Sequence, residues 1–219
     1  MSWDLILSSL GPLLLGAISA TIPLALASFA LGLAIALLVA LMRIGKNRVL
    51  SGAARVYVSI IRGTPLLVQL FVIFYGLPSI GVRLEPWPSA IIALSLNVGG
   101  YAAEVIRAAI LSVPKGQWEA GHMIGMSRQQ TLRRIILPQA ARVSVPPLSN
   151  TFISLVKDTS LASLILVTEL FRQAQQIASV SGDFMALYLQ AAVIYWVICL
   201  FLSMGQSRIE KRLDRYVAH

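Results

Sequence analysis

Long apolar runs separated by short polar segments dominate this chain. The first of these runs carries no charged side chain between residues 5 and 42. A helix that crosses the hydrocarbon core of a bilayer needs about 20 predominantly apolar residues. Five runs are long enough, and they predict membrane spans at about 17–42, 53–75, 88–109, 143–166 and 184–205. The pattern therefore predicts an all-α, polytopic membrane protein with five transmembrane helices.

The N-terminal residues 2–15 precede the first predicted span. They contain Trp3, Asp4 and Pro12 and predict an interfacial helix or a lead-in to the span. A cleaved signal peptide would place positive charge before a short apolar core. Here the first charge is Asp4, the first cation is Arg43, and the apolar core between them is too long. The pattern favours a retained span over a signal peptide.

Composition and charge agree with a membrane protein. Charged residues make up 12% of the 219 residues, against about 25% in soluble domains. The net charge is +9, and most of its cations fall in three clusters: Arg43, Lys46, Arg48 and Arg55; Arg107, Lys115, Arg128, Arg133, Arg134 and Arg142; and Arg208, Lys211, Arg212 and Arg215. Short loops rich in Lys and Arg stay in the cytoplasm. This assignment places the N-terminus outside and the C-terminus in the cytoplasm, and it attributes the positive charge to topology and membrane lipid rather than nucleic acid.

The sequence predicts no catalytic residues, no metal site and no cofactor of its own. Cys199 is the only cysteine and lies in an apolar run, so it can form no internal disulfide. The chain contains no Gly-x-x-x-x-Gly-Lys-Ser/Thr segment for binding nucleotide phosphates. An ATP-driven activity would therefore need a separate subunit.

One polar segment, at about 112–138, is too long for a simple turn between spans. It predicts two short helices, at 119–124 and 127–136, that are joined at Gly125. Ser127 is a suitable N-cap for the second helix, and Pro138 is expected to end it because proline cannot continue a helix. Two small helices held at a membrane surface form a compact knob suited to a groove in a partner.

This segment resembles the EAA loop of ABC import permeases. Seven positions carry the resemblance: Glu119, Ala120, Gly121, Gly125, Ile135, Leu137 and Pro138. Gly121 stands where the family usually has alanine, which keeps the side chain small. The resemblance implies that the loop docks on an ATPase subunit and couples ATP hydrolysis to transport.

Other blocks resemble the permeases of polar amino-acid uptake systems, at 62–65, 75–78, 97–107 and 157–161. Within that family, segments 115–120 and 137–157 are most similar to the L-cystine permeases of Gram-negative bacteria, while arginine, histidine and glutamine permeases stay as alternatives. The resemblance implies a type I importer permease of the bacterial inner membrane, formed by a single domain over 1–219. It also implies two ATPase subunits that bind ATP and Mg, a second permease copy or a paralogue, and a periplasmic amino-acid-binding protein.

Charged residues inside the predicted spans are candidates for the substrate path, since such groups normally face a polar pathway or pair internally. Lys157, Asp158, Thr159 and Ser160 interrupt the fourth span and predict a locally broken helix. We hypothesise that Asp158 lies near the substrate ammonium, and Lys157 or freed backbone N–H groups near its carboxylate. An ion pair that only orders the bundle is the alternative.

Three further residues complete the candidate path: Glu104, Asn97 and Arg62. Glu104 and Arg107 are three residues apart on one helix face. A local ion pair and a gate are the two alternatives for this pair. Arg62 begins a Gly-Thr-Pro break, for which a structural kink is favoured over substrate contact. Two other function classes stay open, a secondary transporter with its own coupling ion and a membrane scaffold. Copurification with an ATPase distinguishes a permease from both.

Overall fold

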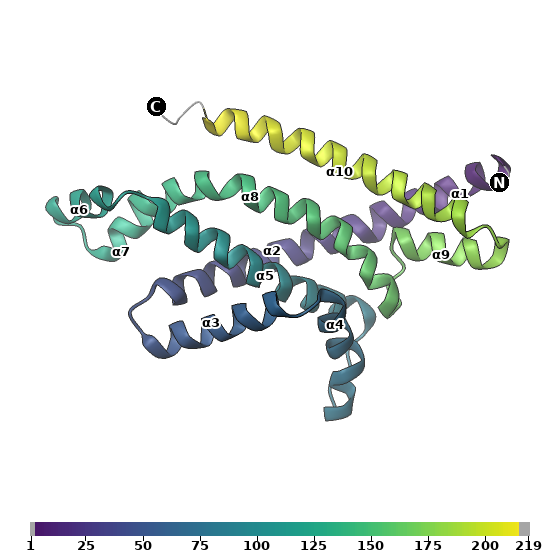
Figure 1. The fold of residues 1–219 in the computed structure, drawn as a ribbon, viewed down its shortest axis with the longest axis horizontal. Coiled ribbons are helices and arrows are strands. Elements are labelled where there is room, and N and C mark those ends of the chain that lie inside the picture. Colours follow the sequence, from purple (N-terminus) through teal and green to yellow (C-terminus); the bar gives the residue numbers. More distant parts are fainter. Residues whose placement is uncertain (1–2, 215–219) are drawn as a thin grey trace.

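A computed structural model describes residues 3–214, and over this range the chain is entirely helical (Figure 1). In chain order the elements are α1 (Trp3–Gly16), η1 (Ala17–Thr21), α2 (Ile22–Ile44), α3 (Arg48–Gly63), α4 (Leu66–Phe71), η2 (Val72–Gly76), η3 (Leu77–Ile80), α5 (Pro86–Ser112), α6 (Lys115–Met123), α7 (Arg128–Thr131), η4 (Leu132–Ile136), α8 (Leu137–Asp158), η5 (Thr159–Ile165), α9 (Leu170–Ser181) and α10 (Phe184–Asp214). Arg215 of the third basic cluster and Ser2 of the N-terminal segment lie outside the described residues.

Three of these helical segments are long and apolar enough to cross a membrane: Trp3–Ile44, Pro86–Ser112 and Phe184–Arg212. Two further pairs qualify if each bent pair is one span. The chain bends by 107° between Arg48–Gly63 and Leu66–Ile80, and by 48° between Arg128–Ile165 and Leu170–Ser181. The chain is therefore an all-helical membrane protein with three to five candidate spans. The predicted span at 53–75 is thus bent at 64–65, inside the expected Gly-Thr-Pro break.

The N-terminal segment is continuous with the first span. α1, η1 and α2 form one helix of 42 residues. Of the two expectations for the N-terminal segment, an interfacial helix or a lead-in to the span, the continuous helix agrees with the lead-in. Pro12 lies inside α1, and Pro23 takes the second position of α2. Neither proline ends the helix, because the turn before Pro23 widens into the π-helical segment η1.

A π-helical turn also precedes two other prolines. The π-helical segments η1, η2 and η4 each end two residues before a proline, namely Pro23, Pro78 and Pro138. A proline in an α-helix lacks its N–H donor and clashes with the carbonyl four residues earlier, and a wider turn relieves that clash. The chain therefore passes Pro138 without stopping, and the expectation that Pro138 ends a helix was wrong.

The centre of the bundle is the close pair α2 and α5, against which α3 and α8 also pack. Glycines allow this approach. A Cβ at Gly32 would lie 2.6 Å from Val98, and one at Gly100 would lie 2.5 Å from Ile61. Small residues at helix contacts are typical of membrane bundles, where close packing replaces the hydrophobic effect as the driving force.

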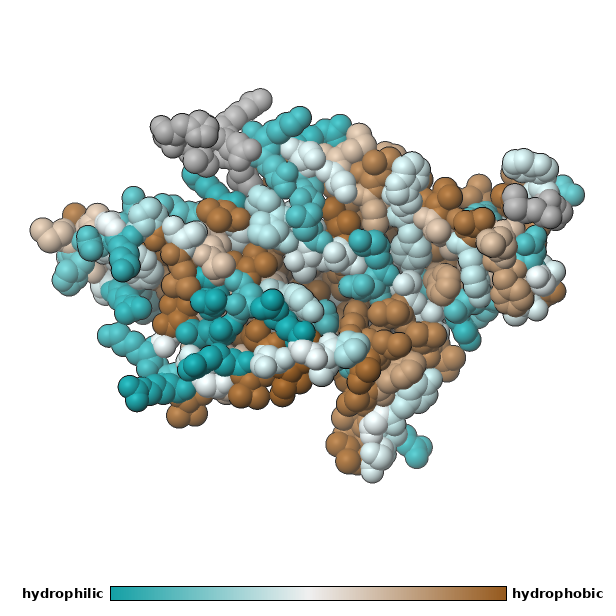
Figure 2. Space-filling model, in the orientation of Figure 1, coloured by the Kyte–Doolittle hydropathy of each residue, from teal (hydrophilic) through white to brown (hydrophobic). Residues whose placement is uncertain are grey.

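The segment between the fourth and last predicted spans forms a further helix, α9, that sequence patterning did not indicate. It packs with α1 and α10 around Leu13, Leu170 and Leu187, which are fully buried. This second cluster lies at the N-terminal end of the bundle, opposite α6 and α7 (Figure 1). Figure 2 shows hydrophilic residues gathered along α3 and over the C-terminal part of α10, with hydrophobic residues over α4.

Candidate functional site

The break between α3 and α4 is held by side-chain hydrogen bonds. α3 ends at Gly63, and Thr64 and Pro65 are extended before α4 begins. The Gln69 Nε2 donates to the Ile61 carbonyl at 2.8 Å and to the Thr64 Oγ1 at 3.0 Å. Such bonds satisfy polar groups that a broken helix would otherwise leave exposed to hydrocarbon. The kink expected after Arg62 is confirmed.

Gln69 also connects this break to α5. The Asn97 Nδ2 donates a hydrogen bond to the Gln69 Oε1 at 3.0 Å. Asn97 is thereby fixed at the elbow between α3 and α4.

The charged segment predicted a locally broken helix at 157–160, but the helix there changes type without a gap, and the 48° bend of this candidate span follows between Ile165 and Leu170. α8 ends at Asp158, and a 3₁₀ helix takes over at Thr159. The Thr159 hydroxyl donates to the Val156 carbonyl, and the Ser160 hydroxyl donates to the Lys157 carbonyl, both at 2.7 Å. These two hydroxyls therefore donate hydrogen bonds to backbone carbonyls at the end of their own helix.

The break between α3 and α4 meets the C-terminal part of α8 at a cavity of about 440 Å³ among α4, α5 and α8. Its lining consists of Thr64, Pro65, Leu66, Asn97, Val98, Tyr101, Asn150, Thr151, Ser154, Leu155 and Asp158. Of the predicted path residues, only Asn97 and Asp158 line this cavity. The Asp158 carboxylate, half-buried, makes no hydrogen bond or close ion pair with the described residues. It is the anionic group in a lining that is otherwise amide, hydroxyl and apolar.

The other predicted path residues lie outside this lining. Lys157 and Arg62 are exposed, and Thr159 is fully buried within the helix end. Ser160 belongs to the same helix end. Arg62 is close to the cavity without lining it, since its guanidinium lies 5.5 Å from the ring centre of Tyr101, which does line it.

Glu104 belongs to a cluster of charges beside the cavity. It forms an ion pair with Arg107, at 3.1 Å, and a second with Arg43 at the end of α2. The predicted pairing of Glu104 with Arg107 is confirmed. Sequence patterning did not indicate the contact with Arg43, which lies on a different helix.

The cavity also contains polar residues that sequence reasoning missed: Tyr101, Asn150, Thr151 and Ser154. A signal for two of them was present. Asn150 and Ser154 recur with Asp158 at intervals of four within an apolar stretch, which places the three on one face of a helix. Thr151 adjoins this polar stripe.

In the segment at 112–138, α6 is the first of the two predicted short helices, whereas the second begins at Arg128 as α7 and runs on through η4 into α8. Gly125 joins them with a φ of +79°, a left-handed conformation that favours glycine. Ser127 and Gln130 form a reciprocal capping box at the start of α7. The Arg128 guanidinium lies 5.7 Å from the centre of the Trp118 ring. The two helices are therefore tied together as a unit at one end of the molecule (Figure 1).

The predicted coupling residues divide into exposed and packed groups. Glu119, Ala120, Gly125 and Pro138 are exposed. Gly121 is buried, and a Cβ there would lie 2.6 Å from the Thr131 Cγ2. Ile135 and Leu137 pack against a cluster centred on Ile110 and Ile136. The exposed tip of the unit carries Met123 and Ile124, which are 84% and 74% exposed.

Comparison with known proteins identifies relatives over nearly the whole chain. The chain is 63% identical over 217 residues to the L-cystine transport system permease protein TcyB of Bacillus subtilis, covering 99% of this chain and 93% of that protein. It is 40% identical to the glutamine transport system permease protein GlnP of Escherichia coli, covering 92% and 93%. Bacillus is Gram-positive, so similarity to cystine permeases is not confined to the Gram-negative group.

Structural similarity leads to the same group of proteins. The crystal structure of an amino acid ABC transporter with histidines has a chain that superposes with a TM-score of 0.91 at 34% identity, covering 97% of this chain and 99% of that one. The model of the binding-protein-dependent transport system inner membrane component family matches residues 28–215. The chain therefore belongs to this family of bacterial membrane proteins, the permease components of ABC transporters whose ATPase is a separate subunit.

Proposed function

We propose that this permease carries L-cystine into the cell across the bacterial inner membrane. The observation that supports cystine is the 63% identity to TcyB over almost the full length of both chains. The corresponding identity to the glutamine permease is 40%. The alternative substrates are other polar amino acids, namely arginine, histidine and glutamine.

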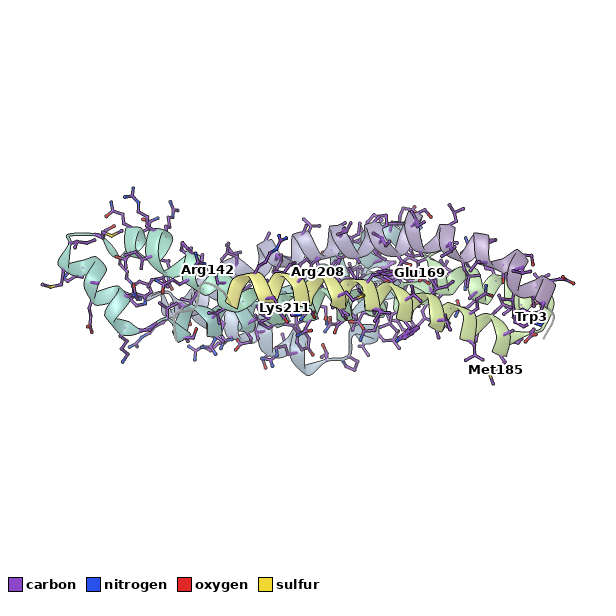
Figure 3. The ribbon with its side chains drawn as sticks, turned by 90° about the horizontal axis from the view of Figure 1, so that it is seen from above. Trp3, Arg142, Glu169, Met185, Arg208 and Lys211 are labelled. Atoms are coloured by element: carbon purple, nitrogen blue, oxygen red, sulfur yellow. The ribbon has the colours of Figure 1, made fainter. Side chains whose placement is uncertain are left out.

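The topology of this proposal has five spans, with the N-terminus outside and the C-terminus in the cytoplasm. The arrangement of basic groups supports it. Arg142 lies towards the end of the molecule that holds α6 and α7, Arg208 and Lys211 lie nearer its middle, and Trp3 lies at the opposite end (Figure 3). The turn between α2 and α3 is also at the α6 end (Figure 1). Basic residues concentrated at one end indicate the cytoplasmic side.

The cavity supplies complementary groups for both ends of an amino acid. Asp158 would accept hydrogen bonds from the substrate ammonium. Asn97 and Ser154 would donate hydrogen bonds to a carboxylate, a role that replaces the one expected for Lys157. The Thr151 hydroxyl already donates to the Pro147 carbonyl at 2.9 Å. A carboxylate within a span is costly unless it pairs or faces water, so an aspartate without a close partner in the described chain favours a cationic ligand.

The energy for transport would enter through α6 and α7. Two ATPase subunits, which bind the ATP and Mg, would dock on the domain formed by 1–219 at its coupling loop, 112–138. The exposed Met123 and Ile124 at the tip suit an apolar groove in such a partner. A second permease copy or a paralogue would complete the path, and a periplasmic amino-acid-binding protein would deliver the substrate.

The test is uptake of radiolabelled L-cystine by proteoliposomes that contain the purified complex and its binding protein, with arginine, histidine and glutamine as competitors. ATP-dependent, cystine-selective uptake is the expected result. Selective uptake of another amino acid would overturn the cystine assignment, and ATP-independent uptake would favour a secondary transporter.

A pair of variants tests the cavity separately. We expect Asp158→Asn to lower uptake about 10- to 100-fold, because a hydrogen bond to a charged group contributes about 1.5–3 kcal/mol. Glu85→Gln is the matched control, since this exposed acid lies outside the cavity. Equal uptake by both variants would show that Asp158 has no part in binding the ammonium.

A further inference from the structure

A polar stripe runs along the whole length of α3. Arg48, Gly52, Arg55, Ser59 and Arg62 follow one another at intervals of four and three residues, which places them on one face of the helix. The three arginines and the serine are exposed. α3 is half of a bent candidate span. The helix therefore presents a row of cations at the depth of the membrane.

Nearby acids do not neutralise this row. In the described part of the chain, none of Arg48, Arg55 and Arg62 forms an ion pair with a carboxylate. Glu104, the acid beside this region, is occupied by Arg43 and Arg107.

Further cations extend the positive charge beyond α3. The charges of Arg55, Arg62 and Arg107 all act on Arg43 at the end of α2. These four cations face the single acid Glu104, so the region between α2, α3 and α5 carries a strong positive charge.

A row of unpaired arginines cannot face lipid hydrocarbon, since intramembrane charges line water-filled spaces or pair with one another. The position of the row indicates where the water lies. At one end, Arg62 stacks over Tyr101, and Tyr101 and Thr64 both line the cavity. At the other end, Arg48 begins α3 directly after the basic turn at 43–47. The row thus connects the cavity to the basic end of the molecule.

We propose that Arg48, Arg55 and Arg62 line a water-filled vestibule that receives the carboxylate end of an amino acid leaving the cavity for the cytoplasm. The cargo and the cytoplasmic side rest on the proposed function. Cations repeated every two turns give a carboxylate a succession of hydrated sites. Several weak sites allow a charged solute both to enter and to leave a path, which one tight site would prevent.

Charge-selective labelling of a cysteine tests this vestibule directly. Ser59→Cys is introduced in a Cys199→Ser background, and the complex with its ATPase is placed in nanodiscs of neutral phosphatidylcholine. The cysteine is then reacted with a negatively charged sulfonatoethyl and a positively charged trimethylammonium-ethyl methanethiosulfonate. Relative to the ratio for a small free thiol, we expect the anionic reagent to be favoured about tenfold or more, since clefts of one charge sign concentrate the opposite ion.

Matched variants identify the source of that preference. Combined Arg55→Gln and Arg62→Gln should return the ratio to that of the free thiol, whereas Arg172→Gln on α9 should leave it unchanged. A cysteine at Val193 on α10, 55% exposed on an apolar face, should react with neither reagent if that face contacts lipid.

Two results would overturn the proposal. If the cysteine at 59 fails to react in both the nucleotide-free and the ATP-trapped complex, lipid or a partner covers the stripe. If both reagents react at the free-thiol ratio, the space is wet but does not select anions. Labelling requires no transport. The labelling result therefore tests the vestibule even if the uptake assay refutes cystine as the substrate.

Discussion

The carboxylate of Glu169 should be a principal anchor of the N-terminal end of the bundle. It is fully buried, and it caps α9 by accepting hydrogen bonds from the Phe171 and Arg172 backbone N–H groups at 2.9 and 2.7 Å. The Tyr195 hydroxyl on α10 donates to it at 2.6 Å, and the Thr21 hydroxyl donates from η1 at 3.5 Å. Every contact comes from a donor, which suits a carboxylate. One side chain thus joins three helical segments.

Tyr195→Phe removes one of these donors without changing the packing of the ring. A hydrogen bond to a charged group contributes about 1.5–3 kcal/mol, whereas hydrogen bonds between membrane helices average about 0.6 kcal/mol. Because the acceptor here is a carboxylate at full burial, we expect a loss of about 2 kcal/mol. Glu169→Gln should lose more, about 3–5 kcal/mol, since its amide group turns donors towards the donors that remain.

Thermal unfolding of the purified chain in detergent measures these losses. For a protein of this size about 1 kcal/mol corresponds to 2–4 °C, so Tyr195→Phe should lower the Tm by about 4–8 °C. Tyr188→Phe is the matched control on the same helix, because the Tyr188 hydroxyl makes no hydrogen bond with the described residues. Equal Tm values for the two variants would refute the anchor. So would additive losses in the Tyr195→Phe/Glu169→Gln double variant, since coupled partners are not additive.

Two other predictions concern glycines that leave no room for a side chain. Gly121→Ala introduces the residue usual in the family but places a Cβ 2.6 Å from the Thr131 Cγ2. This variant should lower substrate-stimulated ATPase activity, and adding Thr131→Ala should restore that activity. Full activity in the single variant would show that α6 and α7 adjust freely. Gly100→Ala places a Cβ 2.5 Å from the Ile61 Cγ2 and should destabilise the bundle by about 1–3 kcal/mol. Adding Ile61→Val should recover part of the lost Tm. An unchanged Tm in Gly100→Ala would contradict the close packing of α3 on α5.

Sequence patterning predicted the features that depend on local chemistry. The Gly125 turn and the Ser127 cap follow from residues close together in the chain, and both are present in the structure. The expectation at Pro138 failed for a physical reason. A rule for α-helices ends the helix at proline, but the π-helical turn before Pro138 absorbs the clash and lets the helix continue.

The features that sequence patterning missed depend on distant partners. Glu169 is isolated in the sequence, and the Thr21 side chain that it contacts lies 148 residues away. The pairing of Arg43 with Glu104 likewise joins two helices. Lys157 and Asp158 are adjacent in the chain, yet only Asp158 reaches the cavity, because consecutive side chains on a helix point in different directions. Sequence patterning can identify such residues, but it does not show which of them contact one another in the folded chain.

The break between α3 and α4 and the C-terminal end of α8 meet at one cavity, and side chains satisfy backbone groups at both places. Backbone groups freed in a span must find other partners. Gln69 bonds to the backbone at the break, and the Thr159 and Ser160 hydroxyls bond to backbone carbonyls at the end of α8. The Asp158 carboxylate, which lines the cavity, takes no part in these bonds. Repair and recognition are thus divided between neighbouring residues, so Thr159→Val should disturb the helix end, whereas Asp158→Asn should disturb only what the cavity binds.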